Sequence, residues 1–284
     1  MTTTANTGAG SAAHGSGVPL AVDLSCSGLT VASHSASAVL LPVVAPASVL
    51  AGIDGSALPP GGDRIECSDR VETAVARFPD RCLMDPVAHA HRDRVDVAGL
   101  SVPVGELLAA PVARALRWAG ARDGDPVVLV VPSDWGISRT TRLAAAVHGL
   151  GVAPRIVRAA LVTAEALPSS SARWAMCVES CRSRTTIGLV QRTRGGLNLV
   201  DRAVVHRHDP FRDTVHDDEV HRILEAIGAL RRRRREAGTG STEVLVRGRV
   251  AERVVDACDR SRLLSFVVPH IAPVEVAPHL YPDF

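Results

Sequence analysis

The stretch that decides the fold runs from residue 125 to residue 157 and reads DPVVLVVPSDWGISRTTRLAAAVHGLGVAPRIV. It opens with a buried apolar run and continues through a polar loop. An alanine-rich amphipathic segment follows, and Gly149 and Gly151 separate it from a second apolar run. Short apolar runs predict strands, and a helix between them allows the two strands to be parallel. The stretch therefore predicts a βαβ unit.

The chain on either side repeats one order of elements. Before the unit come three short apolar runs that predict a three-stranded meander, and then a segment with helical spacing that ends at Gly120; these are LAVDLS, GLTVAS, SAVLLPVVA and residues 103–120. After the unit come a helix, a second meander, a long helix, a strand and a helix. Their segments are 159–167, RWAMCVES, RTTIGLVQRT, GLNLVDRAVVHR, 214–236 and STEVLVRGRVAERVVDACDR. This repetition predicts an α/β protein with two related halves.

Residues 51–100 are expected to be irregular, apart from a helix over 69–77 capped by Ser68 and a hairpin in DVAGLSV.

Composition excludes several functions. The 284 residues are 46% hydrophobic, and all 32 basic residues are arginine, so a Walker A loop, a Schiff base and a pyridoxal anchor are impossible. The net charge is +2, and the aromatic residues are only 3 Trp, 1 Tyr and 4 Phe. The net charge is too small for a strong electrostatic field, and the aromatic residues are too few for a base-stacking surface. No nucleic-acid partner is therefore expected.

The N-terminal segment, the apolar stretches and the cysteines indicate the cellular compartment of the protein. Residues 1–17 are polar, low in complexity and without an apolar signal, which predicts a disordered segment of a cytoplasmic protein. Prolines interrupt the longest apolar stretch, 36–53, so no transmembrane segment is expected. The six cysteines are expected to be free thiols.

We expect a first lobe over 18–157, a reduced second lobe over 158–270 and a tail over 271–284.

The duplicated order resembles the actin, hexokinase and DnaK ATPase superfamily, whose two-lobed fold is ribonuclease H-like. VDLSCSGLTVAS resembles the first phosphate loop of DnaK-type chaperones, with Asp23 and Leu24 matching and serines and cysteine in place of Gly-Thr-Thr. The βαβ stretch resembles the connecting strand and helix of the same proteins. The resemblance implies two carboxylates, Asp23 and Glu179, for a metal–nucleotide site, or else as caps of turns. It further implies nucleotide contacts at Ser25, Ser27, Gly28, Arg182 and Gly248.

Two of the loops depart from the family pattern. The second phosphate loop falls on 179–184, which contains no glycine, and the adenosine loop falls on 244–249, which retains only Gly248. Close approach of a backbone to phosphate requires residues without a Cβ. Arg182 and Arg184 crowd that space, although a guanidinium can itself bind phosphate. Between these two loops the family inserts a whole subdomain, and this sequence has a single predicted helix there. The resemblance thus implies a degenerate pseudo-ATPase, with no resident cofactor except residual ATP and Mg²⁺.

A narrower resemblance covers residues 19–264. The order Pro-Ser, Trp, Ser-Arg in VPSDWGISRTTRLAAAV, together with PRIVRAALVTA and AMCVESCRSRTTIGLV, is similar to the type VII secretion-associated proteins of actinobacteria. It implies a non-catalytic, chaperone-like or scaffold accessory factor of type VII secretion. Its partners would be secretion components or substrates, with peripheral contact to a membrane complex. The alternative is a weak Mg-dependent nucleotide-binding ATPase or kinase-like enzyme that uses Asp23 and Glu179.

Two further features suggest partner contacts. Trp135 follows the strand of the βαβ unit and is either an exposed anchor or a core residue. A basic run ends the long helix, and it is either a docking site for an acidic protein partner or anionic lipid headgroups, or a solvated helix end that suits the helix dipole: Arg231, Arg232, Arg233, Arg234 and Arg235. The histidine pairs lack a convincing metal-ligand spacing, and we expect no metal site.

Overall fold

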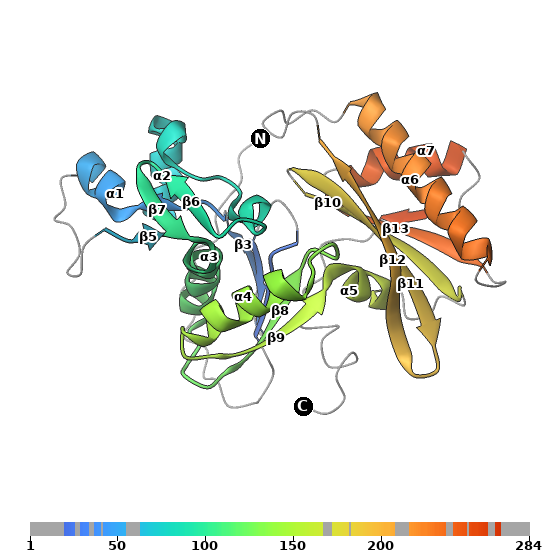
Figure 1. Ribbon diagram of the computed structural model, residues 1–284, viewed down its shortest axis with the longest axis horizontal. Helices are drawn as coiled ribbons and strands as arrows, with labels where there is room; N and C mark the ends of the chain where they lie inside the picture. Colours follow the sequence, from blue (N-terminus) through green and yellow to red (C-terminus); the bar gives the residue numbers. More distant parts are fainter. Residues whose placement is uncertain are drawn as a thin grey trace.

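The computed structural model describes residues 20–25, 29–33, 37–40, 42–54, 63–166, 172–181, 183–207, 216–236, 241–248, 250–260 and 265–267. This part of the chain is a mixed α/β structure with two five-stranded sheets (Figure 1). The predicted disordered segment 1–17 and the predicted tail 271–284 lie outside the described residues.

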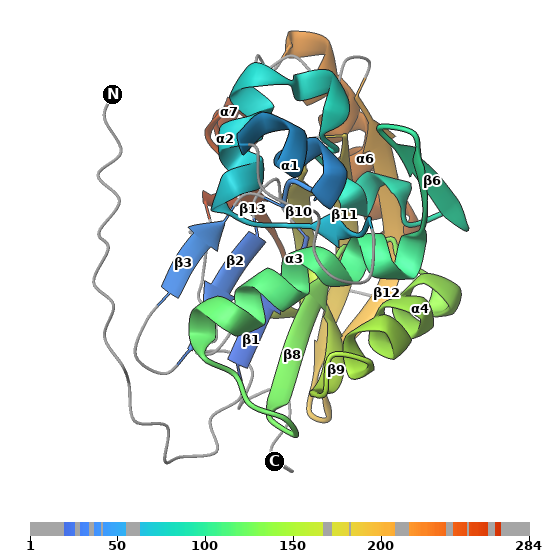
Figure 2. The ribbon, with the colours of Figure 1, turned by 90° about the vertical axis from the view of Figure 1, so that its left-hand side faces the viewer.

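The first sheet has the strand order β3-β2-β1-β8-β9. Its strands are β1 (Leu20–Asp23), β2 (Leu29–Ala32), β3 (Ser37–Leu40), β8 (Pro126–Val131) and β9 (Ala153–Arg158). β1 pairs antiparallel with β2 and parallel with β8, and β8 pairs parallel with β9. Helix α4 (Ile137–His148) connects β8 to β9, which confirms the predicted βαβ unit. Helix α3 (Val104–Ala119) ends at Gly120 in the left-handed conformation, as predicted, and Figure 2 shows it in front of the sheet.

The second sheet repeats this arrangement, with the order β12-β11-β10-β13-β14. Its strands are β10 (Trp174–Ser180), β11 (Arg184–Thr193), β12 (Gly196–His206), β13 (Thr242–Gly248) and β14 (Ser265–Val267). β10 pairs antiparallel with β11 and parallel with β13, just as β1 pairs with β2 and β8. Helices α6 (Asp217–Glu236) and α7 (Ala251–Arg260) complete this second lobe. Both predicted meanders are therefore confirmed.

The chain between β3 and β8 folds into small elements. They are β4 (Ala45–Pro46), α1 (Ala47–Asp54), β5 (Ile65–Glu66), α2 (Asp69–Arg77), the 3₁₀ helices Pro79–Arg81 and Pro86–His89, β6 (Arg94–Val97) and β7 (Leu100–Pro103). The predicted helix and hairpin are confirmed. The expectation of irregular structure missed α1 and the β4–β5 pair. Ser68 stands at the N-cap of α2, but its side chain makes no capping hydrogen bond.

Helix α5 (Ala159–Glu165) lies between the two sheets (Figure 1). It packs on Ala21 and Val128 of the first sheet and on Ala175 and Cys177 of the second. The opposite faces of the sheets pack against α3 and α4 in the first lobe and α6 and α7 in the second. Gly188 lets α5 approach the second sheet, since a Cβ there would lie 2.7 Å from the Cβ of Ala160. The carboxyl ends of both central strands thus meet beside α5.

No disulfide joins any two of the described cysteines, which are Cys67, Cys82, Cys177, Cys181 and Cys258. Among the described residues, no helix is both long enough and apolar enough to cross a membrane.

Candidate functional site

Two buried carboxylates mark where the lobes meet. Asp23 ends β1 and Glu179 lies next to the end of β10, and their exposed fractions are 1% and 0%. Arg247 lies opposite Glu179 in the parallel pairing of β10 with β13. Buried charges require partners, because leaving water is costly for an isolated ion. How each carboxylate is satisfied therefore determines what the site can bind.

Asp23 is satisfied by an arginine from the other lobe. The Arg247 Nη2 donates to Asp23 Oδ2 at 2.6 Å, and it also donates to the hydroxyl of Ser25. The Ser25 backbone nitrogen donates to Asp23 Oδ1 at 2.8 Å, and its hydroxyl bonds to the same oxygen. Arg247 is itself only 2% exposed. Asp23, Ser25 and Arg247 thus form a buried charge-assisted network that joins β1 to β13.

Glu179 is satisfied by a hydroxyl from the other lobe. Ser133, just beyond β8, donates through Oγ to Glu179 Oε1 at 2.6 Å, and its own Oγ accepts from the Ala160 backbone nitrogen at 2.7 Å. Burial raises the pKa of Glu179 to about 7, against the opposing effects of Arg247 and Ser133. The carboxyl group is therefore about half protonated near neutral pH.

Two backbone carbonyl groups beside the carboxylates have close neighbours. The Cys181 thiol bonds to the carbonyl oxygen of Ser25, which adds a third link between the lobes. Gly248 has φ +91°, and a Cβ there would collide with the Ser180 carbonyl oxygen. The glycine that the resemblance assigned to an adenosine loop is therefore required for the close pairing of β13 with β10.

The residues present do not fit a magnesium ion. Mg²⁺ prefers carboxylate oxygens and keeps several waters. The guanidinium of Arg247 already lies against Asp23, and Glu179 is half protonated and bonded to Ser133. Within the described ranges there is no group of three or more His, Cys, Asp or Glu side chains arranged to hold a metal. The site provides its own cation in the form of an arginine.

The structure brings together four of the residues that the sequence singled out: Asp23, Ser25, Glu179 and Gly248. Ser27, Gly28 and Arg182 lie outside the described residues. Sequence reasoning missed the roles of Ser133 and Arg247. The parallel register of β10 and β13 would have placed Arg247 beside Glu179, but nothing in the sequence indicates its contact with Asp23, 224 positions away.

One of the two partner-binding predictions requires correction, and the docking role of the basic run stays a prediction. Trp135 is 0% exposed and packs in the core of the first lobe, so its indole is not an exposed anchor. The described side chains of the basic run differ in their surroundings, and the side chain of Arg235 lies outside what the structure describes. Arg234 is buried over the Trp174 ring, with 5.5 Å between the guanidinium carbon and the ring centroid. Arg233 pairs with Asp201 at 2.8 Å, while Arg232 is exposed.

Comparison with known proteins gives no family: no family model matches the chain, and no curated protein matches it. The clearest relationship lies within the molecule, where the two sheets share strand order and strand direction. Asp23 and Glu179 occupy corresponding positions in these sheets, since each pairs with a threonine on its antiparallel neighbour.

Proposed function

We propose that the chain is a non-catalytic scaffold or chaperone-like protein built on a degenerate DnaK/actin-like fold. The supporting observation is the position of Arg247, whose guanidinium is hydrogen-bonded to Asp23 between two buried strand ends. The repeated sheet order supports the choice of fold. The pairing of Asp23 with Arg247 supports the loss of catalysis.

Nucleotide hydrolysis on such a scaffold requires a metal that neutralises phosphate charge and a group that positions water. A metal at Asp23 would have to displace Arg247 from a pair that is buried on both sides. Removing one partner of a buried pair typically costs about 3–5 kcal/mol. Glu179, the other carboxylate, already accepts the hydroxyl of Ser133, and burial raises its pKa to about 7, which makes its oxygens weaker ligands for a metal than those of an ordinary carboxylate.

The same contacts favour a scaffold role. Arg247 of the second lobe bonds to Asp23 of the first, and Ser133 of the first lobe bonds to Glu179 of the second. These bonds link the lobes at the place where a bound nucleotide would otherwise connect them. A protein locked in this way presents one constant surface to a partner without a nucleotide cycle.

The narrower resemblance suggests type VII secretion components or substrates as the partners. The test is genetic: deleting the gene in its own host should lower export of type VII substrates, and the wild-type chain should restore it. Glu179→Gln, which removes an ionisable carboxylate but keeps an oxygen for Ser133, should restore export equally well. Undiminished export in the deletion strain would contradict the secretion role. Failure of a folded Glu179→Gln chain to restore export would contradict the non-catalytic role.

A further inference from the structure

A second group of charges lies beside the Asp23 and Glu179 pairs, and we call it the arginine cluster. It consists of four arginines around one carboxylate: Arg139 of α4, Arg158 at the end of β9, Arg184 at the start of β11, Arg202 of β12, and Asp134 just after β8. The first lobe contributes Asp134 and two of the arginines, and the second lobe contributes the other two. The cluster therefore lies along the seam between the lobes.

Asp134 cannot satisfy all four guanidinium groups. It pairs with Arg139 through Oδ2 and with Arg184 through Oδ1, each at 3.3 Å. These distances are longer than those of a good charge-assisted bond, which are about 2.7–2.9 Å. Four positive charges thus share one dedicated negative charge. Glu179, the next carboxylate, is half protonated near neutral pH.

Arg158 is the least satisfied member of the cluster. Its Nη1 is buried and finds no hydrogen-bond partner among the described residues. Burial lowers the pKa of Arg158, and the neighbouring charge of Arg202 lowers it further, while Asp134 and Glu179 oppose the shift. Arg184 likewise has a buried Nε without a partner. Buried donors in native proteins are nearly always paired, so these nitrogens call for an acceptor.

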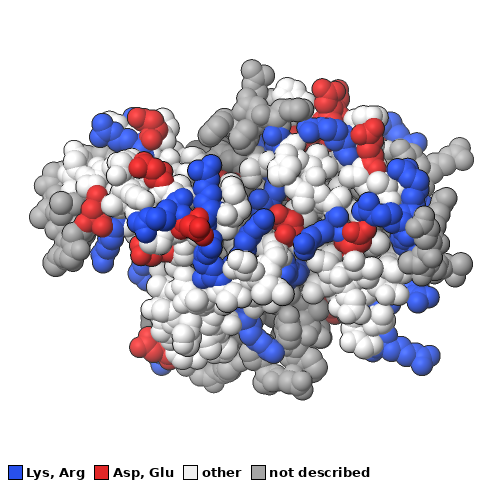
Figure 3. All heavy atoms as spheres, in the orientation of Figure 1, with Lys and Arg blue, Asp and Glu red and all other residues white. Residues whose placement is uncertain are grey.

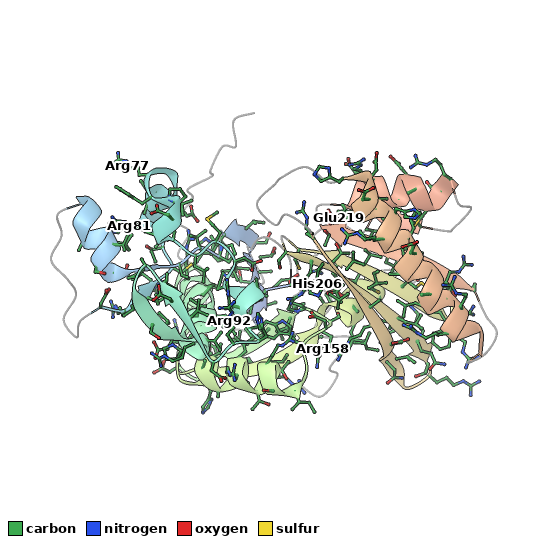
Figure 4. All side chains as sticks on the ribbon, turned by 45° about the horizontal axis from the view of Figure 1, so that its top comes forward. Arg77, Arg81, Arg92, Arg158, His206 and Glu219 are labelled. Carbon is green, nitrogen blue, oxygen red and sulfur yellow. The ribbon has the colours of Figure 1, made fainter. Side chains whose placement is uncertain are left out.

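Arg202 is the member of the cluster that faces solvent. Its Nη1 lies 3.5 Å from the carbonyl oxygen of Ser133. Figure 4 shows Arg158 between the two lobes, below His206, which shares the exposed side of β12 with Arg202. Figure 3 shows basic side chains in a band across this face of both lobes, with acidic ones among them.

We propose that the arginine cluster binds the phosphate group of a small molecule. Guanidinium forks match the oxygens of phosphate, and a doubly charged group balances an excess of positive charge better than one carboxylate does. The phosphate oxygens would accept from the unpaired Nη1 of Arg158 and from Arg202. This site is separate from the Asp23–Arg247 pair, needs no metal and holds whether or not the chain is a secretion scaffold.

The test is calorimetric titration of the full chain with pyrophosphate in the absence of magnesium. We expect saturable binding that weakens at least tenfold in Arg158→Gln and in Arg202→Gln. Arg77→Gln, which removes an exposed arginine at the end of α2, serves as the control for lost charge and should bind as the wild type does. Citrate, a carboxylate of similar charge, should bind more weakly than pyrophosphate.

Thermal unfolding of the ligand-free variants gives a second readout. Arg158→Gln should raise the melting temperature without ligand, because it removes a buried guanidinium nitrogen that has no hydrogen-bond partner, and it should reduce the shift that pyrophosphate causes. An arginine with only a structural role would instead lower the melting temperature when replaced. The proposal is overturned if pyrophosphate fails to bind the wild type at millimolar concentration, if it binds Arg158→Gln equally well, or if citrate binds more tightly.

The same titration separates this site from a residual nucleotide site. Binding at the arginine cluster should be unchanged by Asp23→Asn and should not require magnesium. Magnesium-dependent ATP binding that Asp23→Asn abolishes and Arg158→Gln leaves unchanged would contradict the proposed function while leaving this inference intact.

Discussion

The two lobes place a carboxylate at the same point and satisfy it in different ways. Asp23 pairs across its sheet with Thr30 and Val130, and Glu179 pairs at the corresponding positions with Thr186 and Arg247. The second lobe thus carries an arginine where the first carries a valine. That arginine forms its ion pair with the carboxylate of the other lobe.

The difference shows that the lobes depend on each other. The first lobe's carboxylate takes its cation from the second lobe, and the second lobe's carboxylate takes its hydroxyl donor, Ser133, from the first. Both groups are buried, so each lobe alone would leave an unsatisfied charge or donor. Each lobe thus supplies the group that satisfies the buried carboxylate of the other.

Asp23→Ala should have the largest effect. It leaves the Arg247 guanidinium buried without its carboxylate, which should lower the free energy of unfolding by about 3–5 kcal/mol in urea denaturation. The double variant Asp23→Leu with Arg247→Met removes both charges and should recover most of that loss. A loss under about 1 kcal/mol for Asp23→Ala would mean that the pair does not hold the lobes together.

Glu179→Gln tests the other half of the exchange through pH. The pKa of Glu179 rises from 4.5 to about 7 on folding, so the folded protein binds this proton more tightly than the unfolded chain does. The free energy of unfolding should therefore fall as pH rises from about 4.5 to about 7, by at most about 3 kcal/mol, and then stay level. Glu179→Gln should lack this decline. Parallel pH curves for the two proteins would contradict the burial of an ionisable carboxyl there.

Much of the fold was predictable because its signals are local. The meanders, the βαβ stretch and the left-handed Gly120 follow from apolar runs and glycines within short windows. The small elements between β3 and β8 were harder to predict, since α1 and the two-residue strands depend on packing against distant parts of the chain.

The candidate site was predictable only in part, for the same reason. Asp23 and Glu179 were identified through the resemblance to DnaK-type phosphate loops, and the structure places both in paired strands near their ends. Their partners were not identified, because Ser133 and Arg247 reach them across 46 and 224 positions. Trp135 was ambiguous in sequence, since an indole after a strand suits a core as well as a surface, and only the packing of the first lobe decides between them.

Gly248→Ala tests whether the retained glycine serves the strand pairing. A left-handed residue with a Cβ costs roughly 1–2 kcal/mol, and the collision with the Ser180 carbonyl adds to that. We expect a total loss of about 2–3 kcal/mol in unfolding free energy. Gly120→Ala is the matched control, because Gly120 has φ +67° with open space around it and should lose only about 1 kcal/mol. Equal losses would mean that the close approach of Ser180 is unimportant.

Cys181→Ala should have the smallest effect. It removes a weak thiol donor to the Ser25 carbonyl and a small buried volume, which should cost about 1 kcal/mol. Cys181→Ser keeps a donor and should cost less than the alanine variant. Urea denaturation of both variants gives the comparison, and the reverse ranking would show that this link between the lobes contributes through packing alone.

Calorimetric titration of the wild-type chain with ATP, with and without magnesium, shows whether Asp23 serves the arginine of the second lobe or a metal. Because Arg247 occupies the side of Asp23 that a metal would need, magnesium should add nothing to any ATP binding, and Asp23→Asn should leave that binding unchanged. Saturable binding that requires magnesium and disappears in Asp23→Asn would contradict the account, since Asp23 would then serve a metal and not the second lobe.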